Sequence, residues 1–283
     1  MLYFLISPLI VALLVAIPPT ITPDQKLTPA EIVTKHLDSI GPADARARMQ
    51  GTRVKGECLL TVREGGNGQA QGQIIVSSKG DMNSLKLVFE TGTPIWAQFD
   101  GSKSSASQFR PGRRTSLEKF FADNEVLFKE GLFGGTLSEA WPFFKIETKN
   151  PKLEYLGLKE IAGKKLHTLR YTPRKSSDLK VILYFDPDTF RHVRTEYSQT
   201  VYATDQQRIP GGGGGMPGPS SQRASSTRIT AFEEFADFKE EHGLILPHTY
   251  TFNLSIQSEV KPALIDWSVK LTEFTFNTPF ELS

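Results

Sequence analysis

The chain has 283 residues, with 33 Lys and Arg against 31 Asp and Glu, and a formal net charge of +2 at pH 7. A nearly neutral chain lacks the strongly basic face that nucleic-acid binding requires, so we expect no nucleic-acid partner. The single cysteine, Cys58, excludes an internal disulfide and a zinc site built from cysteines. The stability of the fold must therefore come from packing.

The first eighteen residues carry no charged side chain and are almost entirely apolar. This pattern predicts an export signal within residues 1–22, followed by a proline-containing tether. A run of this length is also at the short end of what spans a bilayer, so an uncleaved N-terminal anchor stays open as an alternative. In both cases we expect residues 27–283 to form a single domain outside the cytoplasm, in the periplasm.

Two capping boxes predict helices. Thr28-Pro29-Ala30-Glu31 has proline at the first helical position, and Gly41-Pro42 ends that helix. Thr115-Ser116-Leu117-Glu118 opens a second helical stretch that we expect to reach about Leu137. Because this second stretch and the residues just after it are rich in phenylalanine and tryptophan, residues 115–144 are called the aromatic segment.

Apolar residues elsewhere recur at every second position, which is typical of strands with one dry face and one wet face. About ten such runs, mostly joined by short turns, predict a β-rich α+β fold. Its large curved antiparallel sheet would form an unclosed barrel covered by helices. Residues 203–226 interrupt the pattern with three prolines, five consecutive glycines and four serines, a composition that predicts a flexible loop.

The dry face of the predicted sheet is the candidate binding surface for an apolar ligand. The residues expected to line it are Leu60, Val62, Leu87, Phe89, Phe252, Leu254, Trp267 and Val269. The aromatic segment is the candidate cover, through Phe120, Phe121, Phe128, Phe133 and Trp141. Aromatic residues at helical spacing are typical of plain core, but Gly131, Gly134 and Gly135 give one end of the segment backbone freedom. A movable lid and a filled core therefore both stay open.

Local patterns resemble those of a known family. They are Gly51-x-Arg53-x-x-Gly56 in the first strand, the Asp186-Pro187-Asp188 turn between two strands, and the strand, glycine turn and Leu-Pro strand that run from Phe235 to Pro247. With the order of elements over residues 27–283, these patterns resemble the LolA/LolB superfamily of periplasmic lipoprotein-localisation factors. The resemblance implies a LolA-like half-barrel whose hollow takes up acyl chains. No functional residue of the family is matched here.

The resulting expectation is an exported binding protein, a carrier in envelope lipoprotein or lipid trafficking. Its partners would be lipid or lipoprotein acyl chains and inner- or outer-membrane envelope proteins, and we expect a monomer without cofactor or metal. The sequence contains no Gly-x-Ser-x-Gly elbow and no His-Glu-x-x-His pair, so we do not expect an enzyme. The alternative is an envelope sensor or protein-interaction module in which the same hollow is a filled core.

Overall fold

The computed structural model describes residues 27–175, 177–202, 226–259 and 261–280. The predicted signal at 1–22 lies outside this range, as does the predicted loop at 203–226 except for Ser226, which begins a strand. Twelve strands are described, where the sequence indicated about ten. They are β1 (Thr52–Arg63), β2 (Asn67–Lys79), β3 (Met82–Phe89), β4 (Ile95–Phe99), β5 (Ser104–Ala106), β6 (Lys152–Ile161), β7 (Lys164–Thr172), β8 (Lys180–Phe185), β9 (His192–Tyr202), β10 (Ser226–Glu241), β11 (Leu244–Gln257) and β12 (Ala263–Thr275).

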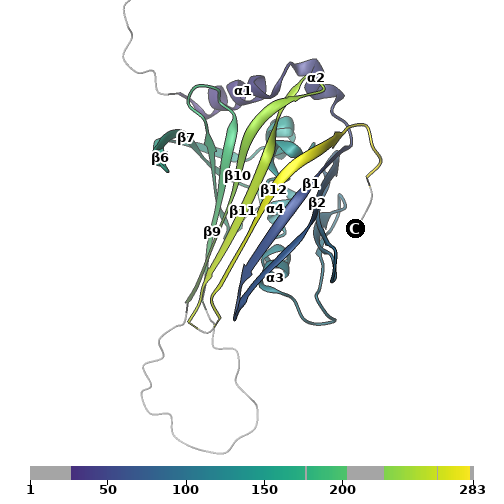
Figure 1. Ribbon diagram of the computed structural model, residues 1–283. Coiled ribbons are helices and arrows are strands. Elements are labelled where there is room, and N and C mark those ends of the chain that lie inside the picture. Colours follow the sequence, from purple (N-terminus) through teal and green to yellow (C-terminus); the bar gives the residue numbers. More distant parts are fainter. Residues whose placement is uncertain (1–26, 176, 203–225, 260, 281–283) are drawn as a thin grey trace, which may run out of the picture.

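All twelve strands form one antiparallel sheet in the order β5-β4-β3-β2-β1-β12-β11-β10-β9-β8-β7-β6. Every neighbouring pair is consecutive in the chain except β1 and β12, which join the first strand to the last. The sheet therefore ends at β5 and β6 and is not closed into a barrel. The chain leaves the β5 edge, crosses one face of the sheet as the aromatic segment, and resumes at the β6 edge (Figure 1).

Short helices cover one face of the sheet, and we call this the inner face. At one end lie α1 (Pro29–Ile40) and α2 (Ala43–Arg48), and α3 (Ser116–Asp123) lies toward the other end (Figure 1). The capping box predicted for α1 is confirmed: Thr28 Oγ1 accepts a hydrogen bond from the Glu31 N–H, and the Glu31 carboxylate accepts one from the Thr28 N–H. The sequence analysis did not identify α2.

The prediction of one helix from Thr115 to about Leu137 is wrong. The capping box does open α3, but the segment then breaks into short turns: α3 (Ser116–Asp123), α4 (Val126–Lys129), η1 (Gly135–Leu137) and η2 (Pro142–Lys145), with α5 (Ile146–Lys149) after it. Gly131, Gly134 and Gly135 adopt left-handed backbone angles, with φ of 71°, 83° and 53°. Such angles cannot continue a right-handed helix.

The core lies between the inner face of the sheet and these helices. In β1, Val54, Cys58 and Leu60 are buried, and they alternate with exposed residues such as Glu57 and Leu59. Strand pairing places buried side chains of neighbouring strands side by side: Leu60 pairs with Trp267 of β12, which pairs with Phe252 of β11. The side chain of Cys58, 4% exposed, therefore faces the core.

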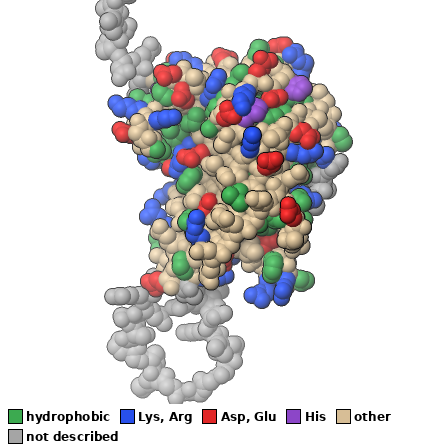
Figure 2. All heavy atoms as spheres, in the orientation of Figure 1, with side chains coloured by type: hydrophobic (Ala, Val, Ile, Leu, Met, Phe, Trp, Pro, Cys, Tyr) green, Lys and Arg blue, Asp and Glu red, His purple; other side chains and the backbone are tan. Residues whose placement is uncertain are grey.

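The opposite, outer face of the sheet is turned toward the viewer in Figure 2. Lys, Arg, Asp and Glu side chains are scattered over it among other side chains and backbone. Cross-strand ion pairs such as Lys55 with Glu273, at 2.9 Å, join neighbouring strands there. No helix among the described residues is long and apolar enough to cross a membrane.

Candidate ligand-binding site on the inner face

The eight predicted lining residues lie together on the inner face. Six of them are 0–5% exposed and belong to the main hydrophobic core: Leu60, Leu87, Phe252, Leu254, Trp267 and Val269. The other two, Val62 and Phe89, are half-buried and pack against that core. The alternation of β1, β3, β11 and β12 was therefore sufficient to bring these side chains to one surface. Whether they hold a ligand stays a prediction.

Four of the five predicted lid residues pack around or onto this surface. The ring of Phe133 lies 5.4 Å from that of Phe252 and 6.2 Å from that of Trp267, in edge contacts. Phe121 and Phe128 surround Phe133 at 5.4 Å and 5.5 Å, and the ring of Phe120 lies 6.1 Å from Phe252. Phe133 is therefore the side chain of the aromatic segment that occupies the centre of the predicted lining.

The fifth lid residue, Trp141, lies in another part of the same core, next to His36 of α1. Its indole stacks on His192 at 4.7 Å, and its Nε1 donates to Nε2 of His36 at 3.1 Å. His36 Nδ1 lies 3.1 Å from the Phe190 carbonyl oxygen. Because an imidazole nitrogen that accepts from Trp141 carries no proton, His36 is neutral and donates through Nδ1. Burial agrees with this assignment, since it lowers the pKa of His36 to about 3.

Hydrogen bonds tie the aromatic segment to β3, to Gly51 just before β1 and to α1. Asn83 of β3 donates to the Phe128 carbonyl oxygen at 2.7 Å, and the Glu139 carboxylate accepts from the Gly51 N–H at 2.7 Å. With the bond between Trp141 and His36, these contacts must all break if the whole segment is to lift as a lid. A movement confined to the neighbourhood of Phe133 breaks fewer of them.

The glycines taken as a sign of backbone freedom have packing roles. A Cβ on Gly131 would lie 1.9 Å from the Ala140 carbonyl oxygen, and its φ of 71° already disfavours other residues. A Cβ on Gly135 would lie 3.0 Å from His192 Nδ1. These glycines are required by close approach and by left-handed turns, so their presence does not by itself indicate a hinge.

A buried carboxyl group lies on the inner face: Glu233 of β10 is fully buried. Its carboxyl accepts hydrogen bonds from the Tyr197 hydroxyl at 2.6 Å, the Tyr250 hydroxyl at 2.7 Å and the Gly134 N–H at 2.8 Å. Two of these donors belong to neighbouring strands, and the third belongs to the aromatic segment next to Phe133. Glu233 thus bonds the cover to the sheet.

Burial decides the charge of this group. Loss of water raises the pKa of Glu233 to about 7, and the three hydrogen bonds oppose that rise only in part. Burial and the nearby carboxyl raise the pKa of Tyr197 and Tyr250 well above 10, so both hydroxyls stay neutral donors. The sequence analysis missed Glu233. The alternation of the strand could have predicted its burial, since Ala231, Glu233 and Phe235 are all buried on one side of β10.

Not all of the apolar inner face is fully covered. A group of its side chains is half-buried and packs against the core from four different strands. We call this group the mouth: Val62, Phe89, Ile229 and Ile256. Since register pairs Ile229 with Ile256 on adjacent strands, the mouth continues the apolar stripe of the inner face.

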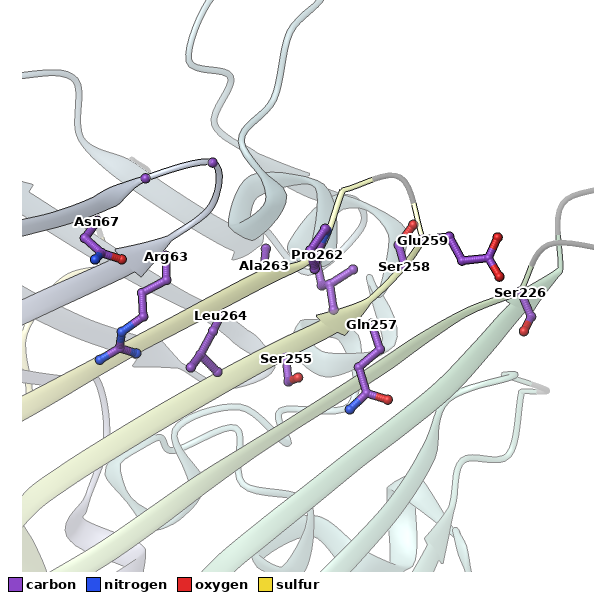
Figure 3. Close-up of a pocket in the computed structure, with 13 residues that line it drawn as sticks. Arg63, Asn67, Ser226, Ser255, Gln257, Ser258, Glu259, Pro262, Ala263 and Leu264 are labelled. Atoms are coloured by element: carbon purple, nitrogen blue, oxygen red, sulfur yellow. The ribbon is translucent and has the colours of Figure 1, made fainter.

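Two open pockets touch the inner face only in part. The first, of about 770 Å³, lies between the β1–β2 turn and the end of the β11–β12 hairpin, where Arg63, Asn67, Ser255 and Gln257 border it (Figure 3). None of its thirteen lining residues belongs to the predicted lining set. The second, of about 960 Å³, lies over outward side chains such as Glu57 and Lys270, and Phe89 and Val269 of the predicted lining set also border it. Neither pocket is lined by the predicted set as a whole.

Neither a reactive cysteine nor a metal site is found among the residues that the structure describes. Burial raises the pKa of the Cys58 thiol to about 12, so it is a protonated core side chain. The Asp186 carboxylate accepts from the N–H groups of Asp188 and Thr189, at 3.1 Å and 2.9 Å, which is ordinary turn chemistry. Among the described residues, no group of three or more His, Cys, Asp and Glu could hold a metal ion.

Comparison with known proteins gives similarity at the level of fold. No protein-family model and no curated protein matches the sequence. A LolA superfamily protein from Nitrosomonas europaea has a TM-score of 0.42 and 14% identity, over 89% of this chain and 95% of that chain. A DUF1329 family protein from Desulfovibrio piger has a TM-score of 0.40 and 9% identity, over 89% of this chain and 94% of that chain.

The structure itself has the predicted architecture, an unclosed antiparallel sheet with a few helices on one face. Because both TM-scores are below 0.5 and both identities below 15%, these matches carry no conclusion about what this chain binds. The residues of the inner face are therefore the basis for inferring a function.

Proposed function

We propose that the chain is an exported binding protein that holds an apolar ligand, the acyl chain of a lipid or lipoprotein, along the inner face of its sheet. The observation that carries this proposal is the mouth, where Val62, Phe89, Ile229 and Ile256 continue the apolar stripe beyond full burial. Export is supported by the uncharged apolar stretch at the start of the sequence. A carrier would pass its ligand to a protein of the envelope.

The ligand competes with the protein's own aromatic rings. Each methylene that moves from water onto the inner face contributes about 0.8 kcal/mol, so a long acyl chain has enough apolar surface to displace one phenylalanine ring. Phe133 is that ring, because it contacts Phe252 and Trp267 directly. The hydrogen bonds that hold the rest of the aromatic segment then stay intact.

Two buried ring nitrogens support an interior built for a further molecule. His192 Nδ1 and Trp267 Nε1 are buried and have no hydrogen-bond partner among the described residues. A finished core satisfies such groups, and the exceptions in native proteins call for a specific explanation. A ligand carrying a carbonyl or hydroxyl oxygen would supply an acceptor for the Trp267 N–H.

A fluorescent long-chain alcohol, whose head group carries no charge, titrated into the purified protein tests the proposal. Val62→Asp puts a charge at the mouth and should weaken binding by about tenfold or more, because burying an unpaired charge costs more than 1.4 kcal/mol. Leu59→Asp changes the same strand on the outer face, where Leu59 is 37% exposed, and should leave binding unchanged. Equal affinity of the two variants, or no saturable binding to the unaltered protein, would exclude the inner face as the site.

A second function is favoured by the sheet edge. Strand β6 ends the sheet and exposes two leucines, Leu156 at 40% and Leu158 at 54%, beside an irregularity at Gly157. An exposed edge of this kind accepts an extended segment of another protein as an added strand. If the chain is an interaction module, amide hydrogen exchange in β6 should slow on addition of envelope extract, with no change in β11 and β12.

A further inference from the structure

The carboxyl of Glu233 lacks an opposite charge. The groups that face it are the Tyr197 hydroxyl from β9, the Tyr250 hydroxyl from β11 and the Gly134 N–H from the aromatic segment. All three are neutral donors. The thiol of Cys58, which lies near Tyr250, is also protonated. A fully buried carboxylate without a cation is costly, and a carboxylate accepts hydrogen bonds only.

Phe133 and Gly134 together occupy the site as an internal ligand would. The Phe133 ring covers Phe252 and Trp267, and the next residue supplies the third donor to Glu233. If an apolar ligand displaces the Phe133 ring, Gly134 is drawn away with it. Glu233 then loses a donor in a buried place, which is unfavourable unless the ligand replaces that donor.

Starting from the function proposed above, we infer that the ligand is an amphiphile whose apolar chain lies along the inner face and whose hydrogen-bond donor, a protonated amine, pairs with Glu233. The chain replaces Phe133 against Phe252 and Trp267, and the amine replaces the Gly134 N–H. The rest of the chain runs toward the mouth. Glu233 and the mouth residue Ile229 are four residues apart on β10, roughly 13 Å at the rise of a strand.

An amine fits this place better than other head groups. A carboxylate head would meet the like charge of Glu233, and an ester would offer only acceptors to an acceptor. A hydroxyl can donate one neutral bond. An ammonium group donates a charge-assisted bond and neutralises the buried carboxylate, which makes it the strongest partner of these four.

Calorimetric titration with dodecylamine, dodecanol and dodecanoic acid at pH 8, below their micelle concentrations, tests the inference. The expected order of affinity is amine, alcohol, acid, with dodecylamine about tenfold tighter than dodecanol. In Glu233→Gln the affinity for dodecylamine should fall to within about twofold of the affinity for dodecanol. Glu240→Gln, at an exposed position of the same strand, is the matched control and should keep the tenfold preference.

The outcomes separate this inference from the function on which it rests. If none of the three compounds binds, the proposed function fails. If all three bind with equal affinity, acyl binding stands and the pairing with Glu233 is overturned. Retention of the amine preference in Glu233→Gln also overturns the pairing. If that variant does not fold, the unaltered protein suffices, because protonation of Glu233 at pH 6 should reduce the amine preference measured at pH 8.

Discussion

Glu233→Gln replaces a fully buried carboxyl by a neutral amide of nearly the same shape, and its effect on stability should depend on pH. Burial raises the pKa of Glu233 from 4.5 to about 7 in the folded protein. The folded state therefore binds more protons than the unfolded state between these two values. It follows that the contribution of this group to stability is fully present below pH 4.5 and is lost as the pH rises to about 7.

The size of the effect follows from the pKa difference. Each pKa unit corresponds to 1.36 kcal/mol, so the unaltered protein should lose about 3 kcal/mol relative to Glu233→Gln between pH 4.5 and pH 7. Buried His36 and His192, whose pKa values are lowered, act in the opposite direction on acidification. They are present in both proteins and cancel in the comparison.

Urea unfolding of the unaltered protein, Glu233→Gln and Glu240→Gln at several pH values between 4.5 and 8 measures this difference. The unfolding free energy of Glu233→Gln minus that of the unaltered protein should increase with pH and level off near pH 7. The same difference for Glu240→Gln should stay flat, since that side chain is exposed. A flat curve for Glu233→Gln would refute the assignment of Glu233 as a buried group that carries no charge at low pH.

Three further predictions concern the cover and the core. Phe133→Ala should lower the unfolding free energy by about 3–5 kcal/mol, while Phe109→Ala, at a residue 52% exposed, should change it by less than about 0.5 kcal/mol in the same urea titration. Gly131→Ala should lower the unfolding free energy by about 2 kcal/mol or more, because its Cβ would lie 1.9 Å from a backbone carbonyl oxygen. Gly66→Ala should leave the unfolding free energy nearly unchanged, because no atom lies within 4 Å of its Cβ. The thiol of Cys58, 4% exposed, should react with a thiol reagent only on unfolding, and rapid labelling of the folded protein would contradict the core position.

Local signals in the sequence were sufficient to predict much of the fold. The Thr28 and Thr115 capping boxes mark the starts of α1 and α3, because a cap depends on residues three positions apart. Alternation placed Cys58, Leu60 and Trp267 on one face, because the side-chain period of a strand is two. These features are properties of short stretches of chain.

Features that depend on distant contacts were missed. The helix expected from Thr115 to about Leu137 breaks because the left-handed turns at Gly131 and Gly134 bring the backbone close to Ala140 and Glu233. Whether the hollow is filled also depends on such contacts, since Phe133 meets Phe252 and Trp267 only after the sheet has formed. The alternation of β10 indicates that Glu233 is buried, but its partners Tyr197 and Tyr250 reach it only because β9 and β11 pair with β10.

Photolabelling with a dodecylamine that carries a diazirine at the end of its chain tests the central claim, that an alkyl chain lies along the inner face. Labelled residues identified by peptide mass spectrometry should be those of the inner face and the mouth, Phe252, Leu254, Ile256 and Val62 among them. Excess unlabelled dodecylamine should suppress the labelling. Label confined to outer-face residues such as Leu59 and Val88, or label that excess dodecylamine does not reduce, would contradict the claim.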